Sequence, residues 1–217
     1  MLSWGSWLAV AGVLLLGAGT ALADPIGPDC GSCQGSIYTL TYSGAPIATG
    51  GGTETFRITL TIDTSGYSGP GSFLDTVAIK VSSMLKVSSS LVSAPGGVAA
   101  WTMVLGGLNA GGCSGSGSGF DCAGAVSTGV GVPMGTPYQW VFDLVMNTGS
   151  LFTGAFQSSV KARYVDGNGD KAGALVSEGI TLQEDFPPIP EPGALLLFAS
   201  AAGALWASRP GARRYSM

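Results

Sequence analysis

Apolar and polar residues alternate with a period of two through most of the chain between residues 24 and 186. In TFRITLTID, residues 55–63, one side is apolar and the other polar; the apolar side is Phe56, Ile58, Leu60 and Ile62. A period of two is typical of a β-strand with one buried face. Similar patterns predict strands at residues 37–42, 76–81, 98–105, 138–146, 159–165, 174–177 and 179–182.

Gly, Pro, Ser and Asn residues separate these segments, and no amphipathic helix is predicted between residues 24 and 186. Seven to nine short strands with turns between them predict an all-β fold, an antiparallel β-sandwich, with a jelly roll as the alternative. The segment from Gly106 to Gly135 holds eleven glycines and no convincing strand. We therefore expect a long irregular loop there, of the kind that is functional or mobile.

The N-terminal residues have the pattern of a secretory signal peptide. Residues 8–23 are uncharged and apolar, and they end with small residues at Ala21 and Ala23. Cleavage after Ala23 by signal peptidase leaves Asp24 as the first mature residue. The first seven residues contain no Lys or Arg, which departs from the usual basic start. The alternative is a retained membrane helix, although the run is short for that.

A second apolar segment lies near the C-terminus, at residues 193–208. Its 16 residues carry no charge, and as a helix they would extend about 24 Å, a little less than a bilayer core. Basic residues follow at once and an aromatic residue precedes them, which is typical of a membrane anchor with its basic end in the cytoplasm. The flanking residues are Trp206, Arg209, Arg213 and Arg214.

A proline-rich stretch precedes this helix and favours an extended, solvated backbone. Its central residues are Pro190, Glu191, Pro192 and Gly193. The order of Pro-Glu-Pro, short apolar helix and basic tail resembles the PEP-CTERM sorting signal of exported proteins of Gram-negative bacteria. The resemblance covers roughly the last 30 residues, and Pro210 within the basic tail departs from it.

The resemblance implies recognition by an exosortase, a membrane-embedded cysteine enzyme that cuts near the motif. It also implies a transient stay in the inner membrane, then the cell envelope, the outer surface or the extracellular matrix, in a system that accompanies exopolysaccharide production. An ordinary tail anchor is the alternative. The expected organisation is a signal peptide (1–23), an exported β domain (24–186) and a sorting segment (187–217).

Charge and composition exclude several classes of function. Between residues 24 and 189 there are twelve acidic and six basic residues, a net charge of −6, which argues against a nucleic-acid partner. The chain has no histidine, which excludes Ser-His-Asp and Cys-His catalysis. We expect a non-catalytic envelope or matrix protein. The alternative is a carbohydrate-binding or carbohydrate-processing module, whose candidate aromatic residues are Tyr38, Tyr42, Trp101 and Trp140. At strand spacing, however, such aromatic residues more often belong to the core.

Four cysteines form two sequence-local pairs, Cys30 with Cys33 and Cys113 with Cys122. In an oxidising compartment each pair is expected to form a disulfide, and the second would stabilise the fold by about 2.7 kcal/mol through chain entropy. Cross-links between the two pairs, a zinc site made of all four thiolates and redox chemistry at Cys-Gly-Ser-Cys are the alternatives.

The segment YVDGNGDKAG places Asp166, Asn168 and Asp170 at the spacing of the first half of a calcium-binding loop. Lys171 then stands where such a loop requires glycine. The other interpretation is a Gly-Asn-Gly turn that joins two strands into a hairpin. No cofactor is expected, and calcium at this loop is the alternative.

Overall fold

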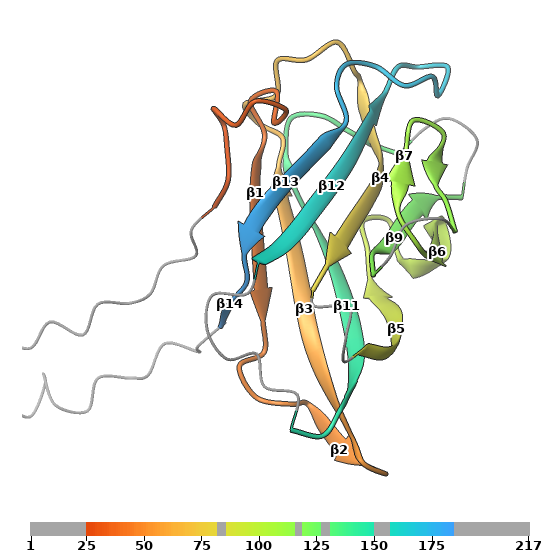
Figure 1. Ribbon diagram of the computed structural model, residues 1–217. Coiled ribbons are helices and arrows are strands. Elements are labelled where there is room, and N and C mark those ends of the chain that lie inside the picture. Colours follow the sequence, from red (N-terminus) through yellow and green to blue (C-terminus); the bar gives the residue numbers. More distant parts are fainter. Residues whose placement is uncertain (1–24, 82–85, 116–118, 127–130, 150–156, 185–217) are drawn as a thin grey trace, which may run out of the picture.

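The computed structural model describes residues 25–81, 86–115, 119–126, 131–149 and 157–184. These residues form fourteen strands and one short 3₁₀ turn, η1 (Val98–Ala100). Two six-stranded sheets lie one on the other, as Figure 1 shows. The all-β sandwich that the alternation predicted is therefore confirmed.

The first sheet has the order β14-β1-β3-β11-β5, with a short strand β2 beside β3. Its pairs are antiparallel, apart from the parallel contact of β1 with β14. Its strands are β1 (Ile37–Tyr42), β2 (Ala48–Gly50), β3 (Thr53–Asp63), β5 (Lys86–Ser93), β11 (Pro137–Asn147) and β14 (Gln183–Glu184).

The second sheet has the order β13-β12-β4-β9-β6, with β10 beside β4, and all its pairs are antiparallel. Its strands are β4 (Phe73–Lys80), β6 (Trp101–Leu105), β9 (Asp121–Ala125), β10 (Val132–Pro133), β12 (Gln157–Val165) and β13 (Val176–Thr181). A separate hairpin is formed by β7 (Leu108–Asn109) and β8 (Gly112–Cys113).

The core lies between the two sheets, where the predicted apolar faces meet. Alternate residues of β1, β3 and β11 are buried, in agreement with the period-two pattern. Ile58, Leu60 and Trp140 have no exposed surface. Burial of each such aliphatic side chain stabilises the fold by about 1.5–3 kcal/mol.

Strand β4 is buried on both faces, unlike the half-buried strands of the first sheet. The β7–β8 hairpin covers its outer side, where Leu108 packs against Ala78 and Cys122. Figure 1 shows this hairpin beside β4 and β9. The central strand of the second sheet therefore carries apolar residues at consecutive positions, and a strict alternation is absent there.

The prediction of an irregular loop from Gly106 to Gly135 is wrong. This segment contains β7, β8, β9 and β10, and β9 lies inside the second sheet between β4 and β6. Strand β9 was not predicted, because its sequence, Asp-Cys-Ala-Gly-Ala, consists mostly of small residues with little β propensity. Its glycine lies close to the second disulfide, since a Cβ at Gly124 would be 3.4 Å from the sulfur of Cys113.

Other expectations also change in detail. The fourteen described strands exceed the expected seven to nine, because several are only two or three residues long. Strand β5, the serine-rich KVSSSLVS, was not predicted. The two strands expected at residues 174–177 and 179–182 form one strand, β13. The hairpin between β12 and β13 is confirmed.

Candidate functional site

The β5–β6 groove lies at one side of the sandwich, where both sheets end. Strand β5 is the last strand of the first sheet and β6 is the last of the second, and residues 94–100 join them directly. The groove has a volume of about 310 Å³ and is lined by Ser89, Ser90, Leu91, Val98, Trp101, Met103 and Leu105. It is therefore an open, mostly apolar channel between two strand edges.

An ion pair that connects the two sheets lies next to Ser89, a residue that lines the groove. Lys86 of β5 donates from Nζ to both carboxylate oxygens of Asp121 on β9, each at 2.7 Å. The hydroxyl of Ser89 donates to the same carboxylate. The Asp121 side chain is fully buried and Lys86 is 12% exposed. Because both charges are enclosed, removal of either side chain would leave the other charge buried without a partner.

The register of β5 explains why a lysine reaches the interior. Lys86, Ser89 and Leu91 lie opposite Met146, Leu144 and Phe142 of β11. The three β11 residues are buried, so the β5 residues opposite them face the core as well. Two register irregularities interrupt the pairing, and the extra residues at these points, Val87 and Val92, are exposed.

The apolar end of the groove is formed around Trp101. Its indole packs edge-on against Trp140 with 5.2 Å between ring centroids. Its Nε1–H donates to the carbonyl of Pro95 at 2.8 Å. These contacts join the Trp101 side chain to the core and to the connection between β5 and β6.

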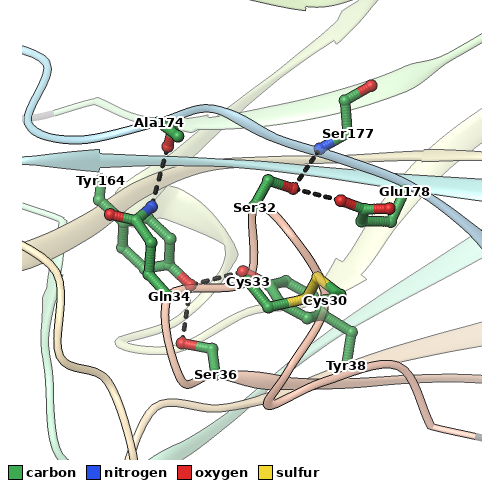
Figure 2. Close-up of a disulfide and its surroundings, with 10 residues drawn as sticks. All are labelled: Cys30, Ser32, Cys33, Gln34, Ser36, Tyr38, Tyr164, Ala174, Ser177 and Glu178. Carbon is green, nitrogen blue, oxygen red and sulfur yellow. Dashed lines mark hydrogen bonds between the residues drawn. A yellow bond between two sulfur atoms is a disulfide. The ribbon is translucent and has the colours of Figure 1, made fainter.

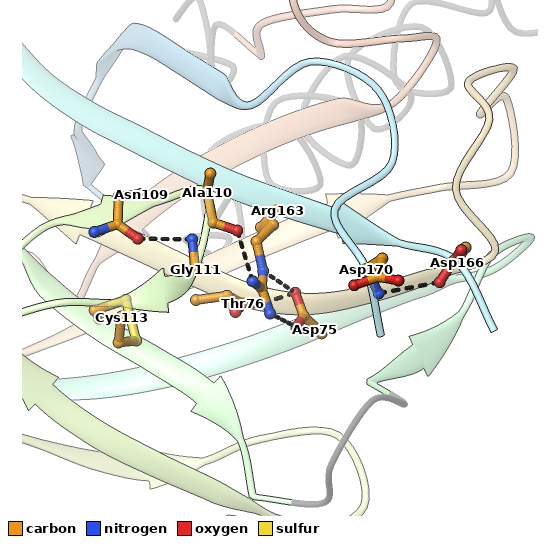
Figure 3. A network of polar contacts seen from close by, with 10 residues as sticks. Asp75, Thr76, Asn109, Ala110, Gly111, Cys113, Arg163, Asp166 and Asp170 are labelled. Atoms are coloured by element: carbon orange, nitrogen blue, oxygen red, sulfur yellow. Dashed lines mark hydrogen bonds and ion pairs between the residues drawn. A yellow bond between two sulfur atoms is a disulfide. The ribbon is translucent and has the colours of Figure 1, made fainter. Parts of the chain in front are cut away.

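A second polar cluster lies on the outer side of the second sheet (Figure 3). The guanidinium of Arg163 on β12 makes a bidentate ion pair with Asp75 on β4, and Nε lies 3.0 Å from Oδ1. Its Nη1 donates to the carbonyl of Ala110 at 2.8 Å. Arg163 therefore ties the β7–β8 hairpin to the sheet that it covers.

The predicted calcium loop forms a tight turn between β12 and β13. The carboxylate of Asp166 accepts the backbone N–H groups of Asn168 and Asp170, at 2.8 and 3.0 Å. Figure 3 shows the bond between Asp166 and Asp170. These hydrogen bonds hold the pKa of the Asp166 carboxyl below its usual range. In the part of the chain that the structure describes, no three His, Cys, Asp or Glu side chains gather as a metal site. The turn is confirmed, and calcium binding stays a prediction.

All four cysteines are paired as sequence-local disulfides, Cys30–Cys33 and Cys113–Cys122. The cross-linked, zinc and free-thiol alternatives are therefore wrong for this structure. Beside the first disulfide, Ser32 donates to Glu178 of β13 at 2.5 Å and Gln34 donates to the carbonyl of Ala174 at 3.0 Å. Figure 2 shows these bonds, which hold Ser32 against β13 and Gln34 against the residues that precede β13.

A buried tyrosine pair lies beneath this segment (Figure 2). The hydroxyls of Tyr38 and Tyr164 are 2.5 Å apart, and the Tyr164 hydroxyl donates to Ser36 at 2.8 Å. Burial raises the pKa of both phenols well above the ordinary value. Both rings are therefore neutral throughout the physiological range and act as hydrogen-bonded core residues.

The aromatic residues considered for sugar binding all belong to the core. Tyr38 and Trp140 are completely buried, and Tyr42 and Trp101 are 8% and 6% exposed. Three of the described carboxylates, Asp75, Asp121 and Asp143, each form an ion pair with a cation. The residues that the sequence suggested for carbohydrate recognition therefore do not present an open aromatic surface.

The predicted sorting and export residues lie outside the described residues. They comprise Ala21, Ala23, Asp24, Pro190, Glu191, Pro192, Gly193, Trp206, Arg209, Arg213 and Arg214. Within the described ranges, no helix has the length and apolar character needed to cross a membrane. The β5–β6 groove and the Lys86–Asp121 pair, by contrast, were missed by sequence reasoning, because residues 35 positions apart meet only when the sheets stack.

No protein-family model and no curated protein sequence matches this chain. Among solved structures, an uncharacterised Nocardia farcinica protein with an immunoglobulin-like fold is 14% identical, with a TM-score of 0.38 over 70% of this chain and 88% of its own. ACE19, the collagen-binding subdomain of the Enterococcus faecalis surface protein ACE, is 10% identical, with a TM-score of 0.36 over 68% and 94%. Likenesses at this level carry no argument about function.

Proposed function

We propose that this chain is an exported, non-catalytic envelope or extracellular-matrix protein that an exosortase sorts through its C-terminal Pro-Glu-Pro motif. The observation that carries the proposal is the order of elements at the C-terminus. Pro190, Glu191 and Pro192 are followed by an uncharged apolar segment and then by three arginines, with a signal-peptide pattern at the opposite end.

The disulfides support an extracytoplasmic location. Both pairs are formed and no cysteine is left free. Disulfides of this kind persist in oxidising compartments and are rare in the cytosol. The fold that they stabilise thus suits a protein that acts after export.

A non-catalytic role agrees with the side chains of the exported domain. The chain has no histidine, and its enclosed carboxylates are occupied by cations, as in the Arg163–Asp75 and Lys86–Asp121 pairs. A carboxylate that is held by a buried cation is poorly placed to transfer protons, because protonation would break the ion pair. Interaction with matrix components, among them exopolysaccharide, is the role that we assign.

Intact-mass measurement of the protein from the envelope or matrix of its host tests the proposal. The mature protein should begin at Asp24 and end between Pro190 and Gly193. Glu191→Ala should cause the full-length form to accumulate, since Glu191 is the one charge in the strip that the enzyme reads. Glu54→Ala, within the β domain, is the control and should be processed normally.

Replacement of Arg209, Arg213 and Arg214 by serine should also impair sorting, because the basic end of the membrane segment is lost. Replacement of the same three residues by lysine retains the charge and should be tolerated. If mature protein from the wild type still contains Trp206 and Arg214, the segment is a permanent anchor and the sorting proposal is wrong.

A further inference from the structure

Two basic side chains converge on one aromatic ring on the outer face of the second sheet. The ammonium group of Lys161 on β12 lies 4.6 Å from the centroid of the Phe120 ring, and that of Lys80 on β4 lies 5.7 Å from it. Both distances are typical of a cation–π contact. Two like charges are therefore held over the same ring.

The other four basic residues between positions 24 and 189 all have an oxygen partner. They are Arg57, Lys86 and Arg163, which pair with carboxylates, and Lys171, which donates to the carbonyl of Gly173. Among the described residues, neither Lys80 nor Lys161 forms an ion pair. Carboxylates are not scarce, because twelve acidic residues accompany the six basic ones in this part of the chain.

The carboxylates nearest to these lysines along the strands face the other side of the sheet. Asp121 follows Phe120 but is fully buried in its own ion pair. Glu178 of β13 lies opposite Val160, which is buried in the core, and adjacent strand residues point to opposite faces. The segments 82–85, 116–118, 127–130 and 150–156 contain no Asp or Glu in their sequence. The two ammonium groups are therefore open to an anion from another molecule.

Hydroxyl groups lie on the same face as the two lysines. The register places Ser159 opposite Lys80 and Ser177 opposite Lys161, and residues directly opposite each other share a face. Figure 1 shows β4, β12 and β13 side by side. We call these four residues and Phe120 the lysine patch. It presents ammonium and hydroxyl groups together on the open face of a sheet.

Charge and chemistry select the class of ligand. Residues 24–189 have a net charge of −6, so an acidic polymer is repelled by most of this surface and can approach at the lysine patch. Lysine offers a compact charge for a single carboxylate, whereas phosphate recognition favours the planar fork of arginine. An open face suits an extended chain, since small ligands are usually enclosed in a cleft.

We propose that the lysine patch binds an acidic polysaccharide of the polyuronate type. Lys80 and Lys161 contact carboxylates of the polymer, and Ser159 and Ser177 hydrogen-bond to its sugar hydroxyls. Phe120 restrains both ammonium groups before binding, which lowers the cost of ordering them. The inference rests on the proposed role as a matrix protein and specifies the polymer. Many copies of the protein on one polymer chain would add avidity to a weak single contact.

Calorimetric titration of the purified full chain, with its disulfides intact and in a mild non-ionic detergent, tests the proposal with polygalacturonate. Saturable binding that weakens with added salt is expected. Lys80→Gln/Lys161→Gln should weaken binding at least about tenfold, whereas Lys80→Arg/Lys161→Arg retains both charges and should stay within about threefold. Lys171→Gln is the matched control, since Lys171 lies in the turn between β12 and β13, and it should change binding less than about twofold.

Two further probes separate the polysaccharide from other ligands. Fully methyl-esterified polygalacturonate has the same sugars without charge and should not bind. Duplex DNA should bind at least about tenfold more weakly, because two lysines contact few phosphates; equal binding of DNA would overturn the choice of polymer. Absence of binding to polygalacturonate, or equal losses in the Lys80/Lys161 and Lys171 glutamine variants, would overturn the site.

Amine acetylation gives a readout without mutation. Polygalacturonate should reduce acetylation of Lys80 and Lys161, measured by mass spectrometry, and leave Lys171 unchanged. Equal labelling of Lys80 and Lys161 with and without the polymer would contradict the proposal. Because the purified chain is unprocessed, failure of these tests would overturn the lysine patch alone, whereas the sorting proposal depends on the mass of the mature protein.

Discussion

Removal of Lys86 from its ion pair should destabilise the fold strongly. In Lys86→Met the side chain keeps a similar length, but Asp121 loses the ammonium group that contacts both its oxygens at 2.7 Å. The Asp121 side chain has no exposed surface, so water cannot replace the lysine. Ser89 remains as a hydrogen-bond donor to the carboxylate, but it carries no charge.

The expected loss is about 3–5 kcal/mol in the free energy of unfolding, which is typical when one partner of a buried pair is removed. At 2.7 Å the attraction between the charges is about 6 kcal/mol at an effective dielectric constant of about 20, and the cost of desolvation offsets part of it. The double variant Lys86→Met/Asp121→Leu should lose at least about 1.5 kcal/mol less than the sum of the two single variants.

Equilibrium unfolding in urea, with the disulfides intact, measures these differences from the midpoints at a constant slope. The matched control is Arg57→Met, since Arg57 pairs with Asp143 at 2.9 Å but its side chain is 44% exposed. An exposed pair should contribute less than about 1 kcal/mol. If Lys86→Met costs no more than Arg57→Met, burial does not govern the strength of these pairs and the reasoning is refuted.

Three further predictions concern other parts of the fold. Gly131→Ala should cost about 1–3 kcal/mol in thermal unfolding, because its Cβ would lie 1.9 Å from a backbone oxygen of β4, whereas Gly50→Ala has open space and should be nearly neutral. Arg163→Met should increase hydrogen exchange in the β7–β8 hairpin, since it removes the bond to Ala110; unchanged exchange would contradict this role. Burial raises the pKa of Tyr42 to about 12. The stabilisation that comes from burying its neutral phenol is therefore complete below pH 10 and should be lost as the pH rises towards 12. Alkaline unfolding followed by tyrosinate absorbance measures this loss.

Strict alternation made most of the first sheet predictable. In β1, β3 and β11 every second residue is apolar, and these residues are the buried ones. A strand with one face on the core and one on solvent has apolar and polar residues at alternate positions, so its own sequence identifies it. The disulfide pairing was also predictable, because each pair is close in the sequence and short loops close easily.

Two strands, β9 of the second sheet and β5 of the first, were less predictable because they depend on neighbours that are distant in the sequence. Strand β9 is short, rich in small residues and enclosed between β4 and β6. Strand β5 is rich in serine, and its pairing with β11 is irregular. Neither segment has a strong local preference for a strand, and both take that form because a partner strand supplies the hydrogen bonds.

By itself the sequence determined the β class, the alternating core of the first sheet, the two local disulfides and the expectation of sorting through Pro-Glu-Pro. These features are encoded in consecutive residues, where period, spacing and order can be read directly. The stacking of the two sheets, by contrast, brings Lys86 to Asp121, lets Arg163 hold the β7–β8 hairpin, and leaves β6 at the edge of the second sheet. These features arise from contacts between residues far apart in the chain, whose energies depend on burial and on which strand stands at an edge.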